Sequence, residues 1–154
     1  MSELLFDKAK VAFVQGKFEE AVQVFGEMIA KDPDNPLAYY SRGVARFSLR
    51  DLAGAIEDYT ASIRLYSRNE KVHCSRGAAL LAQDRTEDAL KDFNQAIELN
   101  PFYPTAYLGR AEAFKRLGEH DQARMDLEVA TKIQQKRGQS QLESQGLMFQ
   151  TPDP

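Results

Sequence analysis

The side chains best suited to nucleophilic or acid–base chemistry are few in this chain of 154 residues, which has two histidines, His73 and His120, and one cysteine, Cys74. A histidine next to a cysteine raises the question of a thiol nucleophile with its general base. Consecutive residues of a helix point in different directions, however, which argues against a His73–Cys74 pair. His120 is flanked by Glu119 and Asp121, and one histidine does not make a metal site. We therefore expect no catalytic residue and no metal site.

Other motifs of catalysis and cofactor binding are missing from the sequence. It contains no glycine-rich phosphate loop, no Cys-x-x-Cys and no His-x-x-x-His. Its acidic pairs, such as Glu19-Glu20 and Glu87-Asp88, fall near the expected starts of helices, where the helix dipole explains them without a function. We predict that the protein is not an enzyme and that it binds no cofactor.

A pattern that recurs every 34 residues explains most of the chain. Alanines occur at this interval, each followed four residues later by a large apolar side chain: Ala21, Ala55, Ala89 and Ala123, then Phe25, Tyr59, Phe93 and Leu127. Arginines and aspartates share the interval: Arg42, Arg76 and Arg110, and Asp58, Asp92 and Asp126. A period of this length is typical of stacked supersecondary units. We expect the recurring opposite charges to form structural ion pairs between helices.

The pattern resembles the tetratricopeptide repeat family, whose units carry an aromatic residue, Leu-Gly and Tyr in a first helix and Ala, an aromatic residue and Pro around a second. Four such repeats fit residues 2–35, 36–69, 70–103 and 104–137, and they leave a C-terminal helix extension and tail at 138–154. Repeat three departs from the pattern, because His73 stands where Tyr39 and Tyr107 stand in its neighbours. We interpret His73 as a packing aromatic residue with a polar tip.

The expected elements are all helical. Apolar residues follow helical spacing, and breakers such as Asn100-Pro101 separate the segments. We predict helices near 3–15, 18–31, 36–49, 52–66, 70–83, 86–99, 104–117 and 120–137, and no strands. Small residues mark close helix crossings, which we expect to set Gly43 against Ala55. The resemblance implies an all-α, right-handed superhelical solenoid of helix-turn-helix repeats.

Composition narrows the classes of partner. The net charge is −3 and its sign alternates from repeat to repeat, so no continuous basic stripe is available for nucleic acid. No apolar run approaches the roughly 18 residues of a membrane span, and no secretion signal precedes the repeats. A single cysteine cannot form an internal disulfide. We expect a cytoplasmic protein that neither binds nucleic acid nor inserts into a membrane.

In the family that the chain resembles, the first helix of each repeat lines a concave groove for a peptide or a partner helix. Carried over to this chain, the positions we select as the groove are Phe6, Lys10, Phe13, Leu37, Tyr40, Val44, Phe47, Lys71, Leu81 and Leu108. Most of them are apolar, and an exposed patch of this kind marks an interaction site unless some of the side chains turn inward. We expect Tyr40, Phe47 and Phe13 to dominate affinity, and replacement of Tyr40 and Phe47 by alanine to leave the melting curve nearly unchanged.

Well-known family members clamp the acidic carboxyl end of a chaperone with two lysines, two asparagines and an arginine. Those positions hold Phe6, Lys10, Ser41, Lys71 and Ser75 in this chain, so only Lys71 matches. Because a single exposed cation contributes little, we do not expect a carboxylate clamp.

Two functional classes remain. In the first, the chain is an adaptor or chaperone-like scaffold whose groove binds an apolar peptide or an amphipathic helix of another protein. In the second, it is a self-assembling scaffold, a homo-oligomer whose groove is filled by its own or a neighbour's tail. Leu147-Met148-Phe149 would be the docking segment, with a loose terminus as the alternative.

Overall fold

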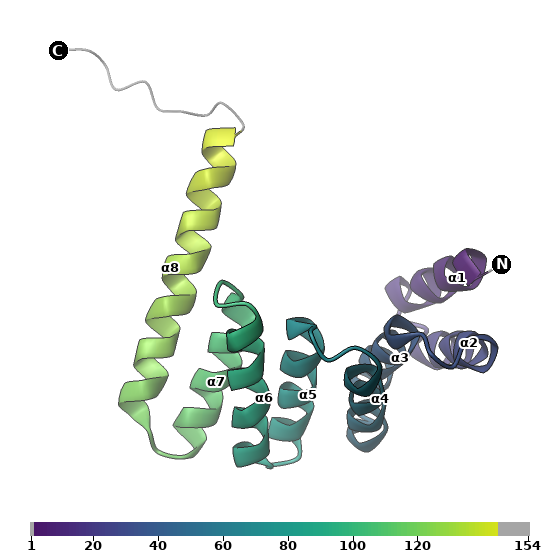
Figure 1. The fold of residues 1–154 in the computed structure, drawn as a ribbon, viewed down its shortest axis with the longest axis horizontal. Coiled ribbons are helices and arrows are strands. Elements are labelled where there is room, and N and C mark those ends of the chain that lie inside the picture. The colour runs from purple at the N-terminus through teal and green to yellow at the C-terminus, as the bar shows by residue number, and fades with distance from the viewer. Residues whose placement is uncertain (1, 145–154) are drawn as a thin grey trace.

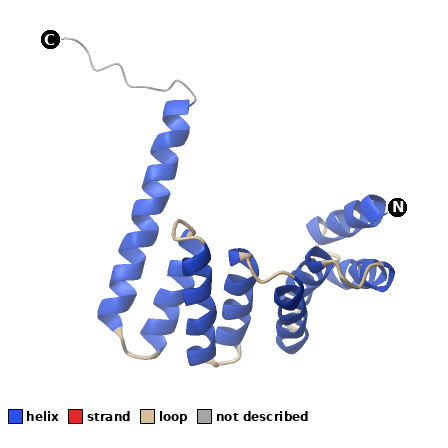
Figure 2. Cartoon of the chain, in the orientation of Figure 1, coloured by secondary structure: helices blue, strands red, loops and turns tan. Residues whose placement is uncertain are grey.

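The computed structural model describes residues 2–144, and within this range it contains eight helices and no strand (Figures 1 and 2). The helices are α1 (Ser2–Val14), α2 (Phe18–Lys31), α3 (Pro36–Ser48), α4 (Leu52–Leu65), α5 (Glu70–Ala82), α6 (Thr86–Leu99), α7 (Pro104–Arg116) and α8 (His120–Ser144). They follow one another along the long axis of the molecule, with α1 near one end and α8 at the other. The all-α prediction is confirmed, and the fold is a helical repeat solenoid.

Local chemistry explains where the helices begin. The side chain of Asn35 accepts hydrogen bonds from the backbone N–H groups of Leu37 and Ala38, and Pro36 occupies the first helical position of α3. Asn69 accepts a hydrogen bond from the backbone N–H of Lys71 in the same way at the start of α5. These caps satisfy N–H groups that the helices themselves leave without partners.

The core is built from the alanines and large side chains of the 34-residue pattern. Ala21, Ala55 and Ala89 are fully buried, and Phe25, Tyr59 and Phe93 are nearly so. A Cβ atom on Gly43 would lie 2.7 Å from a Tyr59 ring carbon, and one on Gly77 would lie 2.9 Å from the Phe93 ring. The expected crossing is therefore close, but its nearest neighbour is the aromatic ring rather than the alanine. Helical side chains lean toward the preceding turn, which places each ring over the alanine.

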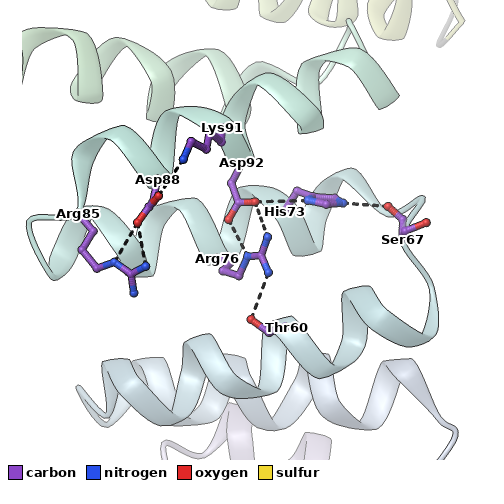
Figure 3. A network of polar contacts seen from close by, with 8 residues as sticks. All are labelled: Thr60, Ser67, His73, Arg76, Arg85, Asp88, Lys91 and Asp92. Atoms are coloured by element: carbon purple, nitrogen blue, oxygen red, sulfur yellow. Dashed lines mark hydrogen bonds and ion pairs between the residues drawn. The ribbon is translucent and has the colours of Figure 1, made fainter.

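The predicted ion pairs between helices are confirmed. Arg76 on α5 donates from Nε and Nη2 to both carboxylate oxygens of Asp92 on α6, at 2.8 Å each (Figure 3). Arg42 pairs with Asp58, and Arg110 with Asp126, in the same two-point geometry. A third nitrogen reaches the preceding repeat, where Arg76 Nη1 donates to Thr60 on α4. Arg110 makes the equivalent hydrogen bond to Asn94, so Arg76 and Arg110 each tie three helices together.

The last helix is longer than the repeat pattern predicts. α8 continues to Ser144, seven residues beyond the predicted end at 137, into the Gln- and Ser-rich segment that we assigned to a helical extension. Its distal part projects past the other helices (Figure 1). Arg137 Nη2 donates to the carbonyl oxygen of Phe102 at 2.7 Å and so ties the extension to the α6–α7 turn. In the range 2–144, no helix is both long and apolar enough to cross a membrane.

Candidate peptide-binding groove

The first helices of the repeats share one face of the solenoid. α5 packs directly against α3 and α7, whereas no comparably close pairing joins α2, α4, α6 and α8 to one another within residues 2–144. Helices on the inside of a curved array approach each other more closely than those on the outside. α1, α3, α5 and α7 therefore line the inner face, where the sequence places the groove.

A cavity of about 310 Å³ opens on this face between α1 and α3. Its walls are almost entirely apolar, with Lys10 and Ser41 as the polar members. The lining residues are Phe6, Lys10, Phe13, Val14, Phe25, Tyr40, Ser41 and Val44. Five of the ten predicted groove residues thus meet around one hollow: Phe6, Lys10, Phe13, Tyr40 and Val44.

The aromatic walls of this cavity are held by the core beneath them. The Phe6 ring lies 6.2 Å from that of Phe25, and the Tyr40 ring lies 5.9 Å from that of Tyr59. Tyr40, Phe13 and Phe47 are half-buried and pack against buried clusters. This packing argues for some loss of stability when these aromatics are removed, because each contributes apolar area to the core. Their role in binding stays a prediction.

Phe25 is a cavity residue that the sequence analysis did not select. It comes from α2, an outer helix, and its ring reaches through to the floor of the groove. The 34-residue pattern includes it among the recurring large apolar residues, and in the structure it is a core residue with only 3% of its surface exposed. Phe25 was visible in the sequence as part of this pattern, but a linear pattern does not show that one face of a buried ring borders a cavity.

The inner face of the C-terminal half is closed by comparison. Leu81 was predicted to line the groove, but it is only 6% exposed and belongs to the core cluster around Phe93. That prediction is corrected, because the direct packing of α5 on α7 covers the side chain. The other predicted residues outside the cavity, Leu37, Lys71 and Leu108, are exposed, and Phe47 is half-buried.

Two small residues explain why the halves differ. Between α5 and α7, the Phe93 ring is in tight contact with Gly77 and Gly109, where an added Cβ would overlap it. The equivalent positions around Phe25 are Ala9 and Ser41, 68 residues earlier in each case. The cavity lies where α1 and α3 carry these additional side-chain atoms.

The residues with potential for chemistry are used for packing. His73 is buried, and its Nε2 donates to the carbonyl oxygen of Ser67 at 2.9 Å (Figure 3). Tyr107 OH makes the equivalent hydrogen bond, to Pro101 O, one period later. The interpretation of His73 as a packing aromatic residue with a polar tip agrees with this geometry. Burial and, to a lesser degree, the charge of Asp92 raise the pKa of Cys74 to about 12, which keeps its thiol protonated.

Metal ligands are not gathered in one place either. Across residues 2–144, no three side chains of the His, Cys, Asp and Glu types lie together as a site for an ion. The segment Leu147-Met148-Phe149, which we predicted to dock in the groove, lies outside the described residues.

Family models match most of the chain. Three models described as tetratricopeptide repeat cover residues 6–70, 70–103 and 105–133. Among curated proteins, RNA polymerase II-associated protein 3 of Mus musculus is 36% identical over 98 residues, which is 64% of this chain and 15% of that protein. The STIP1 homolog of Dictyostelium discoideum is 36% identical over 95 residues, 62% of this chain and 17% of that protein. The chain thus spans less than a fifth of the length of these relatives.

Solved structures share the fold. A crystal structure of MamA superposes with a TM-score of 0.83 at 20% identity, over 90% of this chain and 81% of that one. The first repeat domain of Spaghetti (RPAP3), bound to the HSP90 peptide SRMEEVD, superposes with a TM-score of 0.74 at 30% identity, over 76% of this chain and 93% of that one. Together with the family models, the eight helices and the 34-residue register, these similarities show that the chain belongs to the tetratricopeptide repeat family.

Proposed function

We propose that this chain is a protein-interaction module that binds an apolar side chain of a peptide or amphipathic helix in the cavity between α1 and α3. The observation that carries the proposal is the cavity itself, open on the inner face and walled by Phe6, Phe13, Phe25, Tyr40 and Val44. Aromatic residues in concave, desolvated sites commonly dominate the affinity of protein interfaces.

The size of the cavity suits one anchor residue of a longer ligand. At about 310 Å³ it lies at the lower end of the roughly 300–1,000 Å³ of small-molecule sites. The rest of the ligand would continue along the inner face, past the exposed Leu37 toward Leu108. This is the arrangement of a groove that reads side chains at intervals along an extended chain or a helix.

The charges at the site favour an apolar anchor over an acidic one. Lys10 is the only charged residue that lines the cavity, and its ammonium lies 5.5 Å from the centroid of the Phe6 ring. The similar Spaghetti domain holds the acidic peptide SRMEEVD. Of the residue types that such a clamp uses, this chain keeps only Lys71 in its expected place. A ligand of this chain would therefore gain affinity from apolar burial rather than from several convergent charges.

Binding of two labelled peptides tests the proposal. Fluorescence anisotropy would compare SRMEEVD with a variant in which phenylalanine replaces both glutamates. We expect the apolar variant to bind about tenfold tighter or better, corresponding to about 1.4 kcal/mol. Equal affinity for the two peptides, or a preference for SRMEEVD, would contradict the proposal.

A matched pair of variants locates the site. Ser41→Leu places a larger side chain into the cavity wall and should abolish the preference for the apolar peptide. Met125→Ala removes an exposed apolar side chain from α8, away from the groove, and should leave the preference intact. Circular-dichroism melting curves of both variants check that the fold is kept.

The tail gives a second candidate occupant for the same groove. Deleting residues 146–154 should tighten peptide binding if Leu147-Met148-Phe149 competes for the cavity, and should leave it unchanged otherwise. We also propose that the module acts without catalysis, which is supported by the burial of His73 and Cys74. We propose a cytoplasmic location, which is supported by the presence of a single cysteine.

A further inference from the structure

The face of α1 that points away from the array exposes two large apolar side chains. Leu4 and Val11, seven residues apart on one side of the helix, are 74% and 55% exposed. A hollow of about 500 Å³ lies alongside them, between α1 and the start of α2. Residues 4, 7, 8 and 11 follow the spacing of a single helical face, so Asp7 and Lys8 lie between the two apolar side chains.

The equivalent positions in the other repeats show which contacts this face would make with a neighbouring repeat. The positions equivalent to Leu4 are Ala38, Val72 and Ala106, and those equivalent to Val11 are Ala45, Ala79 and Ala113. All six are at most 1% exposed. They belong to core clusters that contain buried residues of the preceding outer helix, such as Val24, Tyr59 and Phe93. Leu4 and Val11 therefore occupy helix-stacking positions that no described helix covers.

The exposed end of the array at α8 carries different side chains from the end at α1. In α2, α4 and α6, the side chains that pack toward the next repeat include Val22, Ile56 and Leu90, and Ile29, Ile63 and Ile97. The equivalent positions of α8 are Arg124 and Thr131, which are both exposed. A polar outer face is what a terminal repeat needs for solubility. The C-terminal end has such a face, whereas the α1 end keeps apolar residues.

Charge on the α1 face favours a copy of itself. Asp7 and Lys8 form no ion pair among the described residues. Lys8 stands at the position of Arg42 in the next repeat, but Val24 stands where that repeat has the paired Asp58. With Lys17 and Glu20 at the same hollow, the charges of the face balance. When two such faces are aligned antiparallel, each apolar residue therefore meets an apolar residue and each charge meets the opposite charge.

We propose that α1 pairs antiparallel with α1 of a second copy of this chain about a two-fold axis. Leu4 of each copy then packs against Val11 of the other, and Asp7 pairs with Lys8 across the axis. Such an interface is isologous and closes at two copies. A head-to-tail stack is disfavoured, because it would bury Arg124 and Thr131 of α8 against Leu4 and Val11.

The expected dimer is weak. One helix pair covers less area than the about 1,200 Å² at the lower end of stable interfaces, so we expect a dimer that forms only at high protein concentration. Sedimentation equilibrium of the 154-residue chain from 10 µM to 1 mM should therefore show the mass rise from 17.4 kDa toward twice that value. Val11→Lys should hold the mass at that of the monomer, whereas Met125→Lys, at an exposed apolar residue of α8, should not.

The orientation has its own tests. In mixtures under oxidising conditions, a Leu4→Cys chain should cross-link to a Val11→Cys chain, and neither should cross-link efficiently to itself. Asp7→Lys alone and Lys8→Asp alone should weaken the dimer, whereas the double variant D7K/K8D should restore it. The native cysteine does not interfere, because Cys74 is buried.

Three outcomes would overturn the proposal. The chain could remain monomeric at 1 mM, its dimer could survive Val11→Lys, or Met125→Lys could be the variant that abolishes it. The peptide assay is independent of these results, because the cavity between α1 and α3 lies on a different face of α1. Melting curves confirm that each exposed-site variant is folded.

Discussion

The N-terminal and C-terminal halves of this solenoid follow the same 34-residue pattern but pack their inner helices differently. In the C-terminal half, α5 and α7 are in direct contact over Gly77 and Gly109, and the Phe93 ring fills the space beneath them. In the N-terminal half, Ala9 and Ser41 stand at the equivalent positions, and a cavity remains between α1 and α3. A recurring pattern thus fixes the fold while two side chains decide where it is open.

The polar ties follow the same division. Arg76 and Arg110 each bind an aspartate of their own repeat and a polar side chain of the preceding one, Thr60 and Asn94 respectively. Repeat one has Lys8 and Val24 in place of the arginine and aspartate, and Gly26 stands at the position of Thr60. The first repeat is therefore held mainly by apolar contacts. This makes it the part of the array best suited to expose apolar surface to a partner.

The largest effect should come from breaking a polar tie in the C-terminal half. Asp92→Asn removes the charge that Arg76 contacts through two hydrogen bonds, and Asp92 is only 4% exposed. We expect a loss of about 3 kcal/mol in the free energy of unfolding, as for other buried pairs that lose one member. Urea titration measures it. The control is Asp88→Asn, at a more exposed carboxylate on the same helix (Figure 3). Its free energy of unfolding should equal that of the wild type within error.

The Arg76–Asp92 pair should also make the free energy of unfolding depend on pH. Burial alone would raise the pKa of Asp92, but its contacts with Arg76 and His73 outweigh burial and hold that pKa below the ordinary value. A lowered folded-state pKa contributes stability that is complete above the unfolded value of about 3.9 and is lost as pH falls through the folded-state pKa. The stability difference between wild type and Asp92→Asn should therefore shrink below about pH 4. A difference that stayed constant from pH 7 to pH 2 would contradict this assignment.

A smaller effect should follow from forcing the closed half open. In Gly109→Ser the added side chain would overlap the Phe93 ring, so α7 must move away from α5. We expect a net loss of about 1–2 kcal/mol, typical of overpacking. A crystal structure of the variant should show α5 and α7 further apart. Unchanged stability and spacing would mean that the two glycines are not what closes this half.

The smallest effect should be a gain, at a glycine with no such neighbour. Gly138 lies inside α8, and a Cβ there would meet no atom within 4 Å. Gly138→Ala should therefore stabilise the chain by at most about 1 kcal/mol, through helix propensity alone. Thermal melting of this variant beside Gly109→Ser separates the packing role of a glycine from its intrinsic cost in a helix.

Much of the fold was predictable because the information is local and repeated. Helical spacing and breakers such as Asn100-Pro101 placed the helices to within a few residues, apart from the end of α8, and the recurrence of arginine and aspartate predicted their pairing. The candidate groove was predictable only in part. Phe6, Phe13 and Tyr40 do meet at one cavity, but Leu81, at the position equivalent to Phe13, is buried.

The sequence by itself determined the repeat register, the helical class, the core alanines and the ion pairs, because each depends on residues at fixed spacing within one or two repeats. Only the tertiary structure decided which inner-face positions are open. That outcome depends on how two inner helices pack around a ring from a third helix. Ala9 and Ser41 stand at the positions around Phe25, beside the cavity, whereas Gly77 and Gly109 contact Phe93 where the inner helices meet. A groove residue and a core residue can share the same place in the pattern, and their exposure differs because their neighbours pack at different distances.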